Sequence, residues 1–165
     1  MADAFKMIFG AGNFNIRIAY PRISSDMFIY DGSQRSPLPD ISLLDSNITL
    51  TGDYTATGAG DYSFSMSIPS TGYEWSDEKP GTDRTVEWKI LPVVIDPLSE
   101  LEYEFADGDE ISPAFDTNIY RVDGDLTARA TGEYHCGLSL LNYPNYVWSD
   151  DDSISVRTIT WRITE

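Results

Sequence analysis

Large apolar residues alternate with small polar ones over several stretches of the chain. Residues 62–68 (YSFSMSI) and 134–140 (YHCGLSL) carry this alternation in the same phase. A period of two residues is typical of a strand with one buried face. The same pattern in 85–90 and 158–163 predicts two further strands, each with a tryptophan on its inward side. No long stretch has the 3.6-residue period of a helix, so the sequence predicts an all-β protein.

The chain also repeats itself with a period of about 75 residues. The matches extend over nearly the whole length and keep the large aromatic residues in step. We therefore predict two domains, 17–91 and 92–165, with a boundary near Leu91-Pro92, whereas residues 1–16 have no counterpart in the second copy. The clearest matched segments are 52–53 with 124–125, 75–77 with 148–150, and 88–90 with 161–163.

Short strands separated by glycine, proline, aspartate and serine turns predict an antiparallel β-sandwich in each copy. A domain this small has little surface to bury, and large aromatic side chains compensate for that. The recurring Arg84 and Arg157 are expected to pair with an acidic neighbour such as Asp77 or Asp150. The residues predicted to form the structural core are Tyr62, Trp75, Trp88, Tyr134, Trp148 and Trp161.

A glycine, a tyrosine and a cysteine at alternate positions, Gly132, Tyr134 and Cys136, resemble the corner of an immunoglobulin domain. The wider pattern resembles the Ig-like repeats of Gram-positive surface proteins and of the tailed phages that infect such hosts. This resemblance implies two tandem immunoglobulin-like antiparallel β-sandwiches with a short N-terminal extension. The second copy lacks the tyrosine before Asp107-Gly108 and the Gly-Tyr pair before Trp148. The segments of the first copy that carry the pattern are 30–32, 36–37, 57–62, 73–77 and 88–90.

Composition narrows the classes of function. The chain has 165 residues, with 27 acidic and 11 basic side chains, for a formal net charge of −16. Such a charge argues against nucleic acid and anionic membranes as partners, and no apolar run is long enough to span a bilayer. The first residues do not resemble a secretory signal. The single cysteine, Cys136, excludes an internal disulfide, and the single histidine, His135, disfavours acid–base catalysis near neutral pH.

Candidate catalytic and metal-binding groups have simpler explanations. Acidic clusters at 107–110, 123–125 and 150–152 could offer oxygen ligands to Ca²⁺, but charge runs in turns are usually solvated. His135 and Cys136 are adjacent in a strand and therefore point to opposite faces, so they do not form a nucleophile pair. No carboxylate lies in an apolar sequence setting that would raise its pKa. We expect no catalytic residue, no cofactor and no metal site.

Two segments are candidates for binding. Tyr143, Asn145 and Tyr146 lie in a loop that is expanded in the second copy, and tyrosine and asparagine suit recognition. A sugar-stacking platform of tryptophans is the alternative, but their recurrence in both copies favours packing. In the N-terminal segment, the apolar residues Phe5, Met7, Ile8 and Phe9 could add an edge strand or dock onto a larger assembly.

These observations predict a non-enzymatic structural protein of a phage particle, a head or tail accessory protein that displays Ig-like domains. Its expected location is the virion, its partners are capsid or tail proteins, and it is expected to be a homo-oligomer or an arrayed subunit. Weak adhesion to host-surface or environmental glycans is a further expectation. The alternative is a bacterial cell-surface binding or spacer module excised from a larger protein. An enzyme would need a buried carboxylate with a raised pKa in a cleft.

Overall fold

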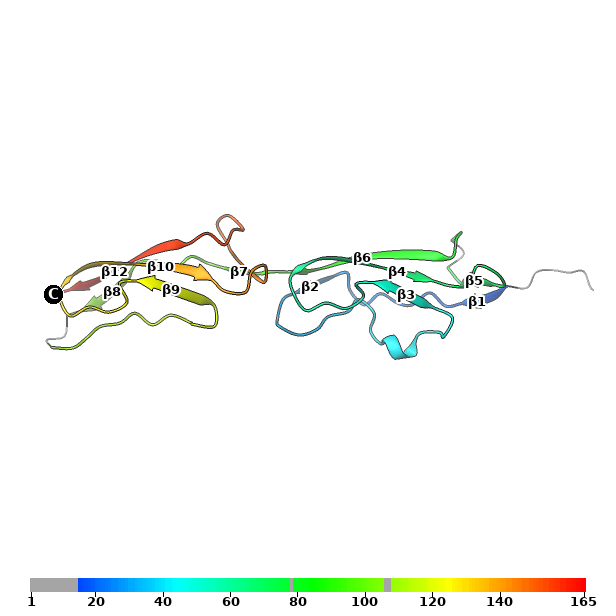
Figure 1. Cartoon of the computed structure of the whole chain (residues 1–165), viewed down its shortest axis with the longest axis horizontal. Helices are drawn as coiled ribbons and strands as arrows, with labels where there is room; N and C mark the ends of the chain where they lie inside the picture. The colour runs from blue at the N-terminus through cyan, green and yellow to red at the C-terminus, as the bar shows by residue number, and fades with distance from the viewer. Residues whose placement is uncertain (1–14, 78, 106–107) are drawn as a thin grey trace, which may run out of the picture. The chain divides into compact units, whose positions relative to one another are not determined.

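The structure is a computed structural model that describes residues 15–77, 79–105 and 108–165 (Figure 1). Within these ranges the chain is all-β, and the one helical element is a single turn of 3-10 helix, η1 (Ile41–Leu43). The alternating stretches 62–68, 85–90, 134–140 and 158–163 all fall on strands, which confirms that part of the sequence analysis. The strands are β1 (Ile16–Ile18), β2 (Met27–Ile29), β3 (Thr49–Gly52), β4 (Gly60–Ser67), β5 (Tyr73–Trp75), β6 (Asp83–Leu91), β7 (Val93–Ile95), β8 (Leu101–Glu104), β9 (Tyr120–Gly124), β10 (Gly132–Leu140), β11 (Tyr146–Trp148) and β12 (Arg157–Thr164).

The strands form two four-stranded and two two-stranded sheets, arranged as sandwich-like pairs of sheets. One four-stranded sheet has the order β2-β6-β4-β3, and the other has the order β8-β12-β10-β9. The two-stranded sheets are β1-β5 and β11-β7. The predicted β-sandwich architecture is therefore confirmed at this level.

The sheets are mixed, so the prediction of antiparallel sheets is correct for some strand pairs and wrong for others. Four strand pairs are parallel, namely β1–β5, β2–β6, β7–β11 and β8–β12. Alternation of apolar residues identifies the buried face of a strand, but it does not reveal the direction of the strand that pairs with it. Parallel neighbours need a long connection between them. In each of these pairs the two strands are accordingly far apart in the sequence.

The interior of the first four-stranded sheet follows directly from the alternation. Along β4 the large apolar residues are buried, with Met66 fully so, whereas the serines between them are exposed or half-buried. Removal of this apolar surface from water stabilises the fold by roughly 25 cal/mol per Å². The buried residues of β4, β6 and the position after β4 are Phe64, Met66, Ile68, Val86, Trp88 and Ile90.

A second core lies along β10 and β12, with further residues from β9 and β11. Its two tryptophans, Trp148 and Trp161, are both fully buried. Partly buried aromatic residues, including Tyr103, Tyr134 and Tyr146, pack against this core. Its buried members are Tyr120, Ala128, Cys136, Leu138, Leu140, Trp148, Ile159, Trp161 and Ile163.

Glycines occupy two positions where one strand closely approaches the next. Gly52 at the end of β3 has φ +99°, and Gly124 at the end of β9 has φ +118°. A Cβ atom on Gly124 would lie 2.8 Å from the carbonyl oxygen of His135, and one on Gly52 would lie 2.8 Å from that of Ser63. Both the backbone conformation and the lack of space therefore favour glycine at these sites.

Contacts along the chain divide it into two compact units. One unit holds the described residues up to Asp26, together with Ser36–Ala56 and Tyr62–Trp88. The other holds Met27–Arg35, Thr57–Asp61 and Lys89–Glu165. The boundary at Leu91-Pro92 stays a prediction from the sequence.

Candidate functional site

The four tryptophans are used in the interior. Trp75, Trp88, Trp148 and Trp161 are at most 3% exposed, so none of them offers a ring face to a sugar. Each indole N–H donates to a backbone carbonyl, which satisfies the one polar group of the side chain. Trp75 donates to the carbonyl of Thr82 at 2.8 Å, and Trp88 donates to that of Asp53 at 2.7 Å. Trp148 donates to the carbonyl of Ser155 at 2.7 Å, and Trp161 donates to that of Asp125 at 2.9 Å.

Tyr134 bonds back to the backbone just upstream of its strand. Its hydroxyl donates to the carbonyl oxygen of Ala130 at 2.8 Å, four residues upstream, and its ring lies 4.6 Å from that of Trp161 in a stacked arrangement. In the other unit, the ring of Tyr62 lies 4.9 Å from that of Trp88. Both tyrosines are half-buried, and each packs its ring against a tryptophan of the last strand in its half.

The predicted arginine–aspartate pairs are confirmed. Arg84 Nη2 lies 3.0 Å from Asp77 Oδ1, and Arg157 Nη2 lies 2.8 Å from Asp150 Oδ1 and 2.7 Å from Asp151 Oδ1. The Arg157 guanidinium donates a hydrogen bond to Asp151 and holds the pKa of that carboxyl at about 2. Arg84 lowers the pKa of Asp77 in the same way.

These arginines also cover tryptophan rings. The guanidinium carbon of Arg84 lies 5.7 Å from the centre of the Trp75 ring, and that of Arg157 lies 5.7 Å from the centre of the Trp148 ring. A cation over an aromatic face is attracted by the ring quadrupole. The arginine, aspartate and tryptophan therefore hold one turn together in each unit.

His135 and Cys136 are separated as the alternation predicted. His135 is exposed and its ring Nδ1 lies 3.3 Å from the hydroxyl of Thr160, whereas Cys136 is 2% exposed in the core. Burial raises the pKa of the Cys136 thiol, which disfavours the reactive thiolate.

The acidic clusters carry ordinary surface contacts where the structure describes them. Glu110 pairs with Arg129 at 3.2 Å, and Asp123 lies 3.5 Å from Arg121. Across residues 15–77, 79–105 and 108–165, no three histidine, cysteine or acidic side chains come together as a metal ion would require. Asp107 lies outside the described residues.

The loop with Tyr143, Asn145 and Tyr146 is partly engaged in internal contacts of the second unit. Asn145 Oδ1 accepts a hydrogen bond from the backbone N–H of Ala59 at 2.7 Å, and the Tyr146 ring meets the Tyr30 ring edge-on at 5.7 Å. Tyr143 is 64% exposed. Of the three residues, Tyr143 is therefore the one whose side chain is presented to solvent.

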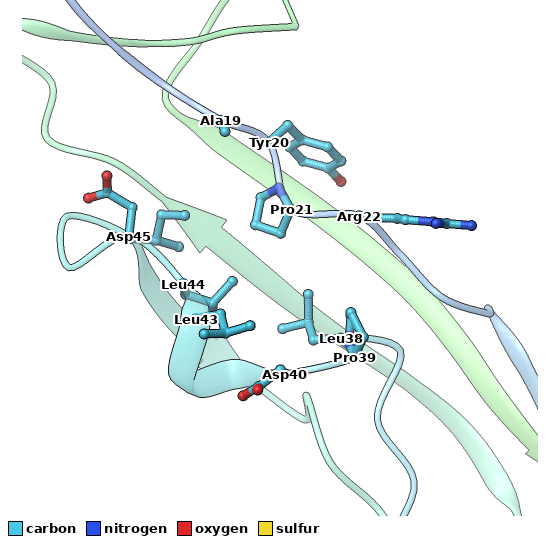
Figure 2. A pocket seen from close by; sticks show the side chains of 11 residues that line it. Ala19, Tyr20, Pro21, Arg22, Leu38, Pro39, Asp40, Leu43, Leu44 and Asp45 are labelled. Atoms are coloured by element: carbon cyan, nitrogen blue, oxygen red, sulfur yellow. The ribbon is translucent and has the colours of Figure 1, made fainter.

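A surface groove that the sequence analysis missed lies in the first unit. It has a volume of about 410 Å³ and runs between residues 19–22 and residues 38–48, which include η1. Figure 2 shows Leu38, Leu43 and Leu44 on one side of the groove and Pro21 on the other. The sequence carries one signal for this groove. Fourteen residues (38–51) separate Pro37 from Gly52 in the first copy, whereas ten (114–123) separate Pro113 from Gly124 in the second.

The floor and rim of this groove differ in exposure. Leu38 is 3% exposed, whereas Leu43 is 81% exposed at the rim. The turn that raises Leu43 is fixed by Asp40, whose Oδ1 accepts from the backbone N–H of Ser42 at 2.9 Å and from its hydroxyl at 2.6 Å. These hydrogen bonds lower the pKa of Asp40, so it stays charged beside an apolar surface.

A second groove, of about 530 Å³, lies in the other unit. It is lined by residues 112–115, by Thr117, and by Tyr120, Arg121, Val122 and Leu126 on or just after the edge strand β9. Leu126 is 40% exposed there. Leu126 is thus less exposed than Leu43, and the described residues that line this groove include no helical turn.

Phe5, Met7, Ile8 and Phe9, the candidate docking residues, lie outside the described residues. Among the residues that are described, no helix has the length and apolar character needed to cross a membrane. The sequence matches no protein-family model, and none of the curated proteins matches it.

Proposed function

We propose that the protein is a non-enzymatic structural protein of a tailed-phage particle, which displays two tandem Ig-like domains as a head or tail accessory protein. The observation that carries the proposal is the recurrence of one strand order. The strands β1 to β6 pair as β1-β5 and β2-β6-β4-β3, and the strands β7 to β12 pair as β7-β11 and β8-β12-β10-β9. In each half the first strand pairs with the fifth and the second with the sixth.

Recurring side-chain contacts support the duplication. The indole of Trp75 and that of Trp148 each bond the carbonyl seven residues ahead, and the arginine near the start of the last strand, Arg84 or Arg157, binds the aspartate seven residues before it. Strand order is a property of a fold that unrelated sequences can share. Equivalent contacts at equivalent positions are better explained by two copies of one ancestral unit.

The Ig-like assignment rests on the corner tyrosine and on the strand arrangement. The bond from the Tyr134 hydroxyl to the Ala130 carbonyl is the contact that defines a tyrosine corner in immunoglobulin domains. Together with the sequence resemblance, it favours the families of surface repeats found on Gram-positive bacteria and their phages.

The chemistry of the surface supports the proposed role on a particle. A net charge of −16 keeps crowded copies soluble and mutually repelled, which suits an array of projecting subunits. The apolar residues 5–9 are the proposed attachment to capsid or tail proteins, and Tyr143 is the proposed centre of weak glycan adhesion.

Mass spectrometry of density-purified virions tests the proposal, with antibody labelling to locate the protein on head or tail. We expect the chain in mature particles, and we expect a variant lacking residues 1–16 to be lost from them. Finding the protein instead in the wall fraction of uninfected bacteria would refute the virion assignment and favour a cell-surface module.

Glycan adhesion is tested separately on a glycan array. The Tyr143→Ala variant is expected to lose binding, whereas Tyr103→Phe, a conservative change in the second core, keeps it. Equal binding by the wild type and Tyr143→Ala would exclude this loop as the adhesive surface.

A further inference from the structure

The four-stranded sheet β2-β6-β4-β3 ends at β3, which pairs with β4 and with no other of the described strands. An edge strand carries a row of backbone N–H and C=O groups that a further strand can bind. Natural proteins protect such edges with charged side chains or proline, among other means. The four residues of β3 (TLTG) include neither, and its exposed side chains are those of Thr49 and Thr51.

The register of β3 determines which of its backbone groups face outward. The N–H of Ile68, just after β4, donates to the carbonyl of Thr82, just before β6, at 3.3 Å. Alternate residues of an antiparallel strand bond the same neighbour, so Met66 also bonds toward β6. Leu50 lies opposite Met66, and the two therefore form a pair without mutual hydrogen bonds. The N–H and C=O groups of Leu50 consequently point to the open edge of the sheet.

The second half of the chain has a charged edge at the equivalent place. The strand β9, like β3, ends on a glycine of positive φ, so Arg121 and Asp123 occupy the positions of Thr49 and Thr51. Their side chains are exposed, and Arg121 Nε lies 3.5 Å from Asp123 Oδ2. Two copies of a chain with a net charge of −16 repel each other. At the neutral edge of β3, a second copy meets no like charge on the strand itself.

The strand β3 is also complementary to itself. When two copies of it run antiparallel with Leu50 opposite Leu50, the outward N–H and C=O groups of these leucines form two backbone hydrogen bonds. Thr49 of each copy then lies opposite Thr51 of the other, in pairs whose side chains are close together. Threonine pairs across neighbouring strands are favourable, and the arrangement has the two-fold symmetry that most dimers have.

We propose that two copies of the chain pair edge to edge through β3, so that their four-stranded sheets join into one continuous sheet. Four residues from each copy bury little surface, and the dimer is therefore weak and reversible. Such a contact becomes effective where many copies are held close together. The inference concerns the purified protein and is independent of whether that protein belongs to a phage particle.

Sedimentation equilibrium of the full chain, at concentrations up to millimolar, tests the proposal with a charge exchange. Thr49→Lys combined with Thr51→Lys sets lysine against lysine in both cross-strand pairs, and we expect the dissociation constant of the dimer to rise about tenfold. The two added lysines change the net charge from −16 to −14, so greater overall repulsion would not explain that loss. Thr49→Lys combined with Thr51→Glu sets lysine against glutamate, and we expect this variant to keep the dimer.

Arg121→Lys combined with Asp123→Lys is the matched control. It places the same two lysines on the equivalent edge strand, β9, and gives the same net charge of −14, because Asp123→Lys alone changes the charge. We expect it to leave dimerisation unchanged. A wild type that is monomeric at every concentration would overturn the proposal, as would equal dissociation constants for the two variants of Thr49 and Thr51. A folding defect caused by loss of the hydroxyls would affect both of these variants alike.

Disulfide formation tests the register independently. Opposed residues of a pair without hydrogen bonds have Cα atoms about 4.5 Å apart, which a disulfide can span. When Thr49→Cys and Thr51→Cys chains are oxidised together, we expect mixed disulfides in clear excess over the half that random pairing would give. Cys136 is 2% exposed and is protected from this reaction. An excess of disulfides between identical chains would contradict pairing about Leu50.

Discussion

Gly124→Ala tests whether the close approach between β9 and β10 sets the stability of the second core. Two effects act on the added methyl group. At φ +118° an L-residue is strained by about 1–2 kcal/mol. The new Cβ would also lie 2.8 Å from the His135 carbonyl oxygen and 3.0 Å from the Cys136 Cα, and both are backbone atoms that cannot move alone.

Relief of such a contact shifts strands and typically costs about 1–3 kcal/mol, as overpacking does in cores. Alanine also lowers the conformational entropy of the unfolded chain, which stabilises the folded state by about 0.4–1 kcal/mol. We therefore expect Gly124→Ala to lower the free energy of unfolding by about 3 kcal/mol, a large fraction of the stability of a small domain.

Gly108→Ala is the matched control. Gly108 has φ +85° and a Cβ there would meet nothing within 4 Å, so this variant keeps the backbone strain without the close contact. We expect it to lose about 1 kcal/mol. Urea unfolding followed by tryptophan fluorescence measures both variants, and equal losses would refute the argument that the approach to β10 dominates.

Three further substitutions test the recurring contacts. Tyr134→Phe removes the hydroxyl bond to Ala130 at 2.8 Å, and we expect a loss of about 1 kcal/mol in urea unfolding. Trp161→Phe removes a fully buried indole and its hydrogen bond, and we expect calorimetry to reveal a loss of about 2–3 kcal/mol. Arg157→Ala removes the largest of the contacts that lower the pKa of Asp151 from its usual 3.8 to about 2, while the hydrogen bonds from Ser153 remain. A lowered carboxyl pKa stabilises the fold above pH 3.8 and loses that contribution as the pH falls toward 2, so the urea midpoint of this variant should depend less steeply on pH in that window than that of the wild type.

The strands could be predicted from the sequence because their pattern is set by burial alone. Phe64, Met66 and Ile68 alternate with serines, and each occupies the core as its position required. The arginine–aspartate pairs could be predicted for a different reason, since Arg84 and Asp77 flank one short turn and recur at the same spacing as Arg157 and Asp150.

The direction of pairing and the groove were beyond the sequence. The parallel register of β2 on β6, with Phe28 opposite Ile90, depends on a crossover that no local pattern encodes. The groove arises because Asp40 caps a single turn that lifts Leu43 out of the surface, and a turn of three residues leaves no periodic signal. Its one trace was the extra length of residues 38–51, which marks an insertion without revealing its shape.

The residues that recur in the two halves differ in their contacts from the residues that do not. The matched tryptophans, arginines and aspartates are engaged in bonds within their own unit, as with Trp148 to the Ser155 carbonyl and Arg157 to Asp150. Substitutions there act on stability, because the indoles are buried and the charges are paired within the turn. Selection for a ligand can therefore operate where the two halves differ, in the extension, in the segment that carries η1, and in the loop that presents Tyr143. On this argument, replacing residues 38–51 by residues 114–123 would remove the turn that raises Leu43 while leaving the strand order intact.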